Sequence, residues 1–205
     1  MNYRILKKSL FVSFLLCCIT VGLAKPPSAA GVLPYFYEKS GKAFFLLGQE
    51  SNNFWADFGG KTEKNEQVLD TAIREFSEET RYVYGKYANQ VKELAKNKPT
   101  KKFLTASMNY IKKRITGKLT HPKGYYVMYM AEVDFIPAGV FKRAKTVPHY
   151  EKRNYAWVSV NKFLNTIQKQ SNRREAHFRK KRIRRQIFDL LKSDADTIRK
   201  IIYPN

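Results

Sequence analysis

The residues best suited to chemistry lie between Gly60 and Tyr82, where the sequence reads GKTEKNEQVLDTAIREFSEETRY. Glu75, Glu78 and Glu79 have the i, i+3, i+4 spacing that stacks side chains on one face of a helix. Like charges at these spacings repel by about 0.2–0.5 kcal/mol per pair, so the cluster is costly unless a cation neutralises it. Carboxylate oxygens suit a hard divalent cation. The pattern therefore predicts a metal site on a helix that follows a Gly-Gly turn.

The same stretch carries the apolar stripe that a packed helix needs. Apolar residues recur at three- and four-residue steps, at Val68, Leu69, Ala72, Ile73 and Phe76. We therefore expect a helix from about Glu66 to Tyr84. Arg74 lies within it, where its guanidinium can brace a neighbouring carboxylate by a forked hydrogen bond.

This stretch resembles the Nudix box. That pattern is Gly, five residues, Glu, seven residues, Arg-Glu, an apolar residue, any residue, Glu-Glu, any residue, Gly and an apolar residue. The matching residues are Gly60, Glu66, Arg74, Glu75, Phe76, Glu78, Glu79 and Tyr82. Arg81 departs from the pattern, because the family has there a glycine that usually ends the helix in a left-handed turn. Since Gly85 lies one turn further on, we expect the helix to continue and stop there.

The resemblance implies an α/β protein with a Nudix-like α/β/α sandwich and a mixed β-sheet, over about residues 30–170. It also implies hydrolysis of a diphosphate that joins a nucleoside to another group. Mg²⁺ or Mn²⁺ would offset the charge of the pyrophosphate and align the attacking water. Because nothing in the pattern names the substrate, ADP-ribose-like nucleotides, capped RNA and inositol pyrophosphates all stay open.

The resemblance also suggests roles for single residues. Catalytic roles fall to Glu75, the favoured base, to Arg74, which would orient it, and to Glu79. The implied metal ligands are Glu75, Glu78, Glu79, the Gly59 carbonyl and Glu151. Glu66 and Gly60 would support these groups, Glu66 by holding Arg74. An acid outside the box often completes such sites; Glu151 is the first choice, with Glu132 and Asp134 as alternatives.

The first 24 residues have the anatomy of a secretory signal peptide. Three cations (Arg4, Lys7 and Lys8) precede an uncharged, mostly apolar run from Ser9 to Leu23, and small residues precede a cleavage point after Ala24. We therefore expect a secreted or periplasmic protein without stable membrane insertion. The apolar run is short for a membrane span, which needs about 20 residues, but an uncleaved anchor is the alternative.

Both cysteines lie inside this leader. A processed chain would therefore have no disulfide and no thiol for zinc binding or covalent catalysis. The 39 Lys+Arg against 17 Asp+Glu give a net charge of +22, which favours polyanionic partners such as nucleotides or RNA. Charge alone identifies neither the partner nor the oligomeric state.

The rest of the chain is divided by its apolar patterning. We expect a linker at 25–29, a hairpin from Gly31–Tyr37 and Ala43–Leu47, and a short strand at Phe54–Phe58. Strands are also expected at Gly124–Ile136 and Tyr155–Val160, and a helix at Asn161–Ile167 with Asn161 as its cap. Residues 86–117 show helical rather than strand patterning, which predicts one or two inserted helices.

Residues 171–205 are expected to form a basic C-terminal helical extension. Its stretch RREAHFRKKRIRR, from Arg173 to Arg185, holds eight basic residues and one acid. The following apolar positions (Ile183, Ile187, Leu190 and Leu191) predict a docked helix. This stretch supports a rival function, in which a non-catalytic Nudix scaffold binds nucleic acid or another polyanion through the basic helix.

Other residues are ambiguous from the sequence. The aromatic pairs Phe54–Trp55 and Tyr125–Tyr126 suit either base stacking or the core. His121, His149 and His177 are isolated along the chain and have no pattern that predicts catalysis.

Overall fold

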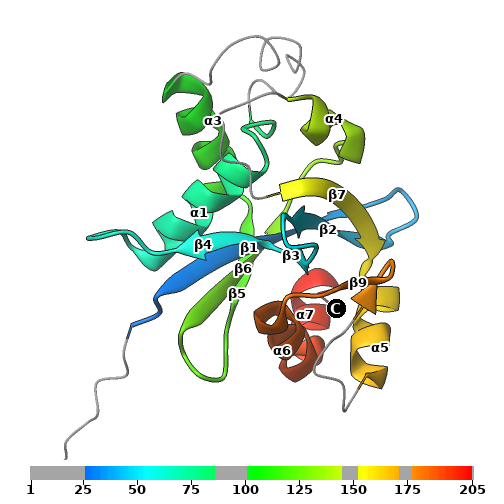
Figure 1. Cartoon of the computed structure of the whole chain (residues 1–205). Helices are drawn as coiled ribbons and strands as arrows, with labels where there is room; N and C mark the ends of the chain where they lie inside the picture. The colour runs from blue at the N-terminus through cyan, green and yellow to red at the C-terminus, as the bar shows by residue number, and fades with distance from the viewer. Residues whose placement is uncertain (1–25, 86–100, 145–151, 171–176, 205) are drawn as a thin grey trace, which may run out of the picture.

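A seven-stranded mixed sheet lies between two layers of helices (Figure 1). The computed structural model describes residues 26–85, 101–144, 152–170 and 177–204. The predicted leader, His149 and Glu151 therefore lie outside the described residues. The α/β class with a mixed sheet between helices is confirmed.

The sheet is built around its first strand. Its strands are β1 (Ala29–Tyr37), β2 (Ala43–Glu50), β3 (Trp55–Ala56), β4 (Phe58–Lys61), β5 (Ile115–Thr120), β6 (Tyr126–Glu132) and β7 (Lys152–Ser159). β1 pairs antiparallel with β2 and β4 and parallel with β6; β5 extends the sheet beyond β6, and β3 and β7 both pair with β2. Because both faces of β1 are covered, its sequence AAGVLPYFY is apolar almost throughout.

Each face of the sheet has its own apolar core. One layer holds α1 (Val68–Glu79), α3 (Lys101–Lys112) and α4 (Ala138–Arg143); the other holds α5 (Val160–Lys169), α6 (Arg185–Ser193) and α7 (Ala195–Ile202) (Figure 1). Successive strand residues point to opposite faces. Thus Val32 packs with Phe76 of α1, whereas Leu33 packs with Leu190 and Ile198 of the other layer.

The box helix ends earlier than its sequence predicts. α1 stops at Glu79, and Arg81 and Tyr82 both adopt left-handed backbone angles, with φ of 58° and 55°. The expected continuation to Gly85 is therefore wrong. Arg81 takes the turn that glycine favours, and its guanidinium donates to the carbonyl oxygens of Lys142 and Ala144, both at 3.1 Å.

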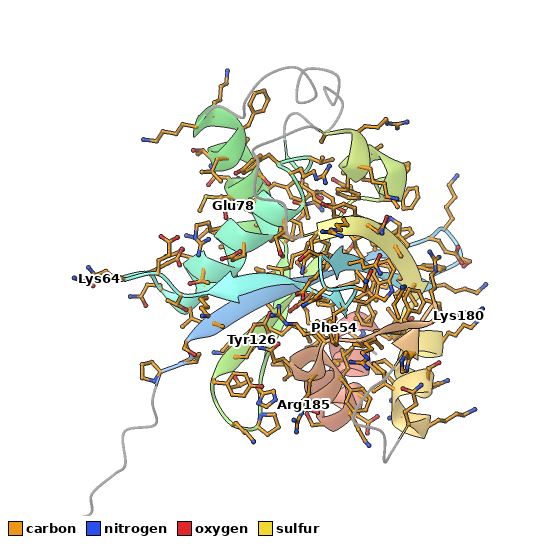
Figure 2. All side chains as sticks on the ribbon, viewed as in Figure 1. Phe54, Lys64, Glu78, Tyr126, Lys180 and Arg185 are labelled. Carbon is orange, nitrogen blue, oxygen red and sulfur yellow. The ribbon has the colours of Figure 1, made fainter. Side chains whose placement is uncertain are left out.

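Within the described part of the basic run, residues 177–182 form a hairpin instead of decorating a helix, and residues 173–176 lie outside the described residues. Two short strands, β8 (His177–Phe178) and β9 (Lys181–Arg182), pair antiparallel around Arg179 and Lys180, which both have positive φ. Positive φ at both central residues is the signature of a tight two-residue hairpin turn. Lys180 at this turn and Lys64 before α1 project from opposite sides of the molecule (Figure 2).

Two further boundaries differ from expectation. β5 begins at Ile115, inside the stretch expected to be a helical insertion, because pairing with β6 extends the sheet to this residue. Asn161 lies within α5, whose N-terminal cap position is Ser159, so Asn161 does not cap it.

Among the described residues, no helix is both long and apolar enough to cross a membrane.

Candidate active site

The β4 strand brings the Gly-Gly pair directly against the box helix. The Glu75 carboxylate lies so close to Gly60 that a Cβ at this position would overlap its oxygens. Glycine at position 60 is therefore needed for the approach of helix and strand. This contact explains why a Gly-Gly turn precedes the acids, as the sequence pattern requires.

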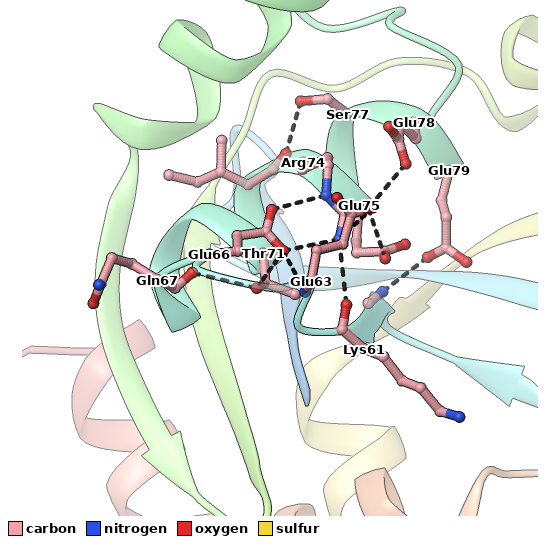
Figure 3. A network of polar contacts seen from close by, with 12 residues as sticks. Lys61, Glu63, Glu66, Gln67, Thr71, Arg74, Glu75, Ser77, Glu78 and Glu79 are labelled. Carbon is pink, nitrogen blue, oxygen red and sulfur yellow. Dashed lines mark hydrogen bonds and ion pairs between the residues drawn. The ribbon is translucent and has the colours of Figure 1, made fainter. Parts of the chain in front are cut away.

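Arg74 gathers three carboxylates on the outer side of α1 (Figure 3). Its Nε donates to Glu66 Oε1 at 2.8 Å, and Nη1 donates to Glu75 Oε1 at 2.9 Å and to Glu78 Oε2 at 3.2 Å. We call Glu66, Glu75 and Glu78 with Arg74 the outer carboxylate cluster. The contacts predicted for Arg74 with Glu75 and with Glu66 are present, while the catalytic roles stay predictions.

The ionisation of the outer carboxylate cluster follows from these contacts. The hydrogen bond from Arg74 lowers the pKa of Glu66 to about 2. Partial burial raises the pKa of Glu78, although Arg74 opposes the shift. Hydrogen bonding to Glu66 raises the pKa of Arg74 above its already high ordinary value. Arg74 is therefore a permanent cation beside these three carboxylates, and Glu66 bears a negative charge at neutral pH.

Glu79 belongs to a different group, although it directly follows Glu78. Its carboxylate is turned toward the strands (Figure 3), where Oε2 accepts the Gly59 N–H at 2.8 Å and Oε1 lies 3.3 Å from Lys152 Nζ. Lys152 Nζ is also 3.3 Å from Glu50 Oε1, and Arg184 Nη1 donates to the same oxygen at 2.6 Å. Glu79 is thus held inside the molecule by a lysine from β7.

Asp57 completes this second group, and its carboxylate accepts the Tyr126 hydroxyl at 2.6 Å. Burial raises the pKa of Asp57 to about 6. Burial also acts to lower the pKa of Lys152, but attraction by Glu79, Glu50 and Asp57 outweighs it and leaves that pKa raised. We call Glu50, Asp57 and Glu79 with Lys152 the inner carboxylate cluster.

The three box glutamates therefore do not converge on one point. Among the residues that the structure describes, no three His, Cys, Asp or Glu side chains are grouped so as to hold a metal ion. Glu79 contacts Lys152, whereas Arg74 holds Glu75 and Glu78, and the Glu75 carboxylate also lies against Gly60. The all-oxygen donors Glu75 and Glu78 fit a hard cation chemically, while Glu79 does not fit as long as Lys152 holds it.

The other predicted acids do not join the box. Glu132 ends β6, four residues beyond Met128, which is level with Gly31 and Gly59 in the sheet, so it lies about 13 Å along the strand from Gly59. Asp134 accepts hydrogen bonds from Tyr110 at 2.9 Å and from Arg114 at 3.3 Å. Both lie at or beyond the Glu132 end of β6, away from Gly59, and their role as alternatives to Glu151 stays a prediction.

A cleft of about 310 Å³ opens beside Gly59 and Gly60. It is lined by the starts of β1, β6 and α6 and by β4, through Ser28, Ala29, Gly59, Gly60, Lys61, Tyr125, Tyr126, Arg184 and Gln186. The cleft thus combines two cations and two phenol rings next to the box. The sequence did not place Arg184 and Gln186 at this cleft, because the stretch that contains Arg184 was interpreted as part of a separate basic extension that could bind a polyanion.

The aromatic candidates separate in the structure. The Tyr126 hydroxyl is committed to Asp57, and Trp55 is buried in the core, so neither ring is available for stacking. Tyr125 lines the cleft and packs against His121, with 4.3 Å between ring centroids. His121 Nε2 in turn lies 3.5 Å from Asp189 Oδ2, so His121 contacts a neighbouring helix and a tyrosine ring.

Comparison with known proteins identifies the family of this chain. The sequence model of the NUDIX domain matches residues 25–180. The chain belongs to the NUDIX family. This Nudix protein is also 27% identical over 188 residues to the uncharacterized protein L534 of Acanthamoeba polyphaga mimivirus, a match that covers 71% of the chain. The chain spans only 61% of the length of that relative.

Solved structures of Nudix proteins are also similar to this chain. A Caenorhabditis elegans Ap4A hydrolase in a binary complex matches at 17% identity and a TM-score of 0.42, over 83% of this chain and 97% of its own. A mutT/nudix family protein from Listeria innocua matches at 16% identity and a TM-score of 0.44, over 86% and 96%. The NUDIX domain of Shewanella oneidensis NrtR, complexed with ADP ribose, matches at 16% identity and 0.38, over 69% and 77%.

Proposed function

We propose that this Nudix protein is a metal-dependent pyrophosphohydrolase that cleaves a diphosphate linkage in a nucleoside-diphosphate-type substrate. The observation that carries the proposal is the outer carboxylate cluster, which an arginine holds in place next to a cleft that contains cations. Membership of the family supports hydrolase activity, and Nudix hydrolases generally use divalent metals.

The cleft has the chemistry to bind such a substrate. Lys61 and Arg184 provide positive charge for phosphate oxygens, and the fork of Arg184 suits them by shape. Tyr125 offers an aromatic face against which a base can stack. Because Arg184 also binds the buried Glu50, its guanidinium is held at the rim of the cleft instead of extending into solvent.

Glu75 and Glu78 would hold Mg²⁺ or Mn²⁺, and the Gly59 carbonyl and Glu151 are further candidate ligands. The bound ion would offset the negative charge of the scissile diphosphate. Glu75 is the proposed general base, because Arg74 fixes its carboxylate at 2.9 Å beside the Gly-Gly pair. Arg74 acts as a positioning residue for Glu75, and Glu66 holds Arg74 from its other side.

Activity measurements test the proposal directly. Purified protein with Mg²⁺ or Mn²⁺ should hydrolyse at least one of ADP-ribose, NAD, dinucleoside polyphosphates, inositol pyrophosphates or capped RNA. Loss of a general base typically costs 10²–10⁴-fold, so Glu75→Gln should lower kcat by about that factor. Glu38→Gln, which alters an exposed ion pair far along the chain, is the control. Equal turnover by Glu75→Gln and the wild type would exclude this site.

The rival function rests on the hairpin of β8 and β9. Its four consecutive basic residues, from Arg179 to Arg182, are all exposed. Such a hairpin suits binding of RNA or another polyanion through phosphate contacts. Salt-sensitive binding of RNA, with no turnover of any substrate tested, would favour the polyanion-binding function. Turnover that depends on Glu75 would favour the hydrolase.

We also infer that the protein is exported, as the leader pattern predicts. Cleavage after Ala24 would leave Lys25 as the first residue. Mass spectrometry of protein recovered from outside the cytoplasm should find that N-terminus. Recovery of the intact leader in a membrane fraction would favour the uncleaved anchor.

A further inference from the structure

Lys152 lies in a place where a lysine is costly. Its side chain is fully buried, and its ammonium lies 3.3 Å from carboxylate oxygens of both Glu50 and Glu79. Lysine and glutamate are almost never buried to this degree unless they are paired. The contact is therefore a specific charge arrangement in the interior, and the function proposed above does not use it.

The surroundings are shaped to hold this lysine. Gly48 on the neighbouring strand leaves room for its stem, because a Cβ at Gly48 would come within 2.8 Å of Lys152 Cδ. Arg81 donates to the carbonyl oxygen of Lys152 at 3.4 Å and to two carbonyls near the end of α4. Arg81 is the residue that departs from the box pattern, so this departure helps to fix the start of β7.

The ammonium and a divalent ion would compete for the same oxygens. Glu79 Oε2 already accepts the Gly59 N–H, and Oε1 faces the ammonium. An ion that ligated Glu79 would lie next to a fixed positive charge, and the low-dielectric interior strengthens that repulsion. A lysine ammonium is a compact point charge with three donors, so it can satisfy several carboxylates as a cation does.

We propose that Lys152 is a built-in cation that occupies Glu79 and excludes a divalent ion from the inner carboxylate cluster. Divalent ions then bind through the outer carboxylate cluster alone. Removal of the ammonium would take away the cation beside Glu79 and so let a hard divalent cation use its carboxylate oxygens, whereas Glu50 would keep its hydrogen bond from Arg184 at 2.6 Å. The inference rests on the proposed function only in taking the outer carboxylate cluster as the metal site.

Binding of Mn²⁺ to the full chain without substrate is the first test. Electron paramagnetic resonance of free Mn²⁺ gives the affinity and the number of ions bound. Glu79→Gln should leave the affinity within about twofold of the wild type, whereas Glu75→Gln should weaken it tenfold or more. Equal weakening by both variants would overturn the proposal. If the wild type binds no Mn²⁺, the outer site of the proposed function fails, and the next test still decides on Lys152.

The second test removes the ammonium but keeps an unbranched stem. Lys152→Met should bind one more Mn²⁺ than the wild type, and the thermal midpoint of this variant should rise with Mn²⁺. Lys152→Arg keeps the charge and should gain no ion. The double variant Lys152→Met with Glu79→Gln should lose the additional ion. Lys42→Met, which removes an exposed lysine from a pair with Glu38, controls for net charge.

A stable Lys152→Met protein with unchanged Mn²⁺ stoichiometry and unchanged thermal response would overturn the proposal. So would an additional ion that persists in the double variant, because its ligand could not then be Glu79. Should Lys152→Met fail to fold with and without Mn²⁺, the comparison of Glu79→Gln with Glu75→Gln decides alone.

Discussion

Two neighbouring glutamates of one helix have opposite surroundings. Glu78 is partly exposed and contacts Arg74, whereas Glu79 is buried and contacts Lys152. A step of one residue turns a side chain by about 100° around a helix, so one of the pair faces solvent and the other faces the sheet. Each acid therefore has its own cation, and the two cations differ in access to solvent, because Arg74 is partly exposed and Lys152 is fully buried.

Glu66 should contribute to stability in a pH-dependent way. Its folded-state pKa is lowered to about 2, so its stabilising contribution is present above the ordinary value near 4.5 and is lost as the pH falls toward 2. Glu66→Gln should lower the unfolding free energy at pH 7 by about 1–3 kcal/mol, the usual worth of a hydrogen bond to a charged group. Urea unfolding between pH 3 and 7 measures this.

The unfolding free energies of Glu66→Gln and the wild type should approach each other as the pH falls from 7 toward 3. Glu38→Gln, in an exposed pair at 3.7 Å, should show little change at any pH. A difference between Glu66→Gln and the wild type that stays constant down to pH 3 would show that Arg74 does not set the ionisation of Glu66.

At the scale of residues, the sequence predicted the contacts that lie within one helix and its preceding loop. Arg74 meets Glu66 and Glu75 within a stretch of ten residues, so local sequence alone is enough to bring these side chains near one another. Lys152 could not be predicted, because it is brought to Glu79 only by the pairing of β7 with β2. Nothing in the local sequence of a strand distinguishes a lysine that points inward from one that points to solvent.

At the scale of elements, the left-handed turn after α1 is formed by Arg81, whose side chain holds it in place, and not by a glycine, which would adopt this backbone conformation without strain. An L-residue in the left-handed region costs roughly 1–2 kcal/mol. Arg81 bears this cost, and its guanidinium ties the end of α1 to α4 and to the start of β7. The turn therefore joins three elements that a glycine would leave unconnected.

Two substitutions of Arg81 separate the cost of its left-handed backbone from the benefit of its guanidinium hydrogen bonds. Arg81→Ala loses the guanidinium and keeps the strained φ, whereas Arg81→Gly loses both. We expect both variants to be less stable than the wild type, because charge-assisted hydrogen bonds are lost. Arg81→Ala should be the less stable of the two, by about 1 kcal/mol. Denaturant unfolding of the three proteins measures the series, and Arg81→Ala at wild-type stability would show that the contacts contribute nothing.

Element types followed from sequence patterns more reliably than element ends. The apolar stripe predicted the α1 helix correctly, and the continuous apolar runs predicted β1 and β2 correctly, because a short run of this kind fits a strand that is buried on both faces. The end of α1 and the hairpin of β8 and β9 depended on positive φ at arginine and lysine, which composition does not reveal.

At the scale of the whole molecule, the C-terminal helices complete one of the two helical layers. Ile187, Leu190, Ile198 and Ile202 are all buried in the same core as Leu33 and Phe45 of the first hairpin. Sequence analysis treated this stretch as an extension, because its basic residues dominate its composition. Its apolar stripe has the larger structural consequence, since the sheet would otherwise expose one face.

Leu190→Ala should show how much the fold depends on this layer. Truncation of a fully buried leucine usually costs 2–5 kcal/mol, so the unfolding free energy should fall by about that amount. Asp196→Ala, at an exposed pair in the next helix, should cost less than about 1 kcal/mol. Thermal or urea unfolding measures both. A loss at Leu190 as small as that at Asp196 would mean that the two helices form a separable appendage.

The last helix also fastens the first hairpin. The Tyr37 hydroxyl donates to the carbonyl of Ile202, 165 residues downstream, and the Tyr203 hydroxyl accepts the N–H of Ala43. At a synthesis rate of about 5–20 residues per second, roughly 10–30 s separate the emergence of these two partners from the ribosome. The nascent chain therefore has to wait, with one side of its earliest strands uncovered, until almost the whole polypeptide has been translated.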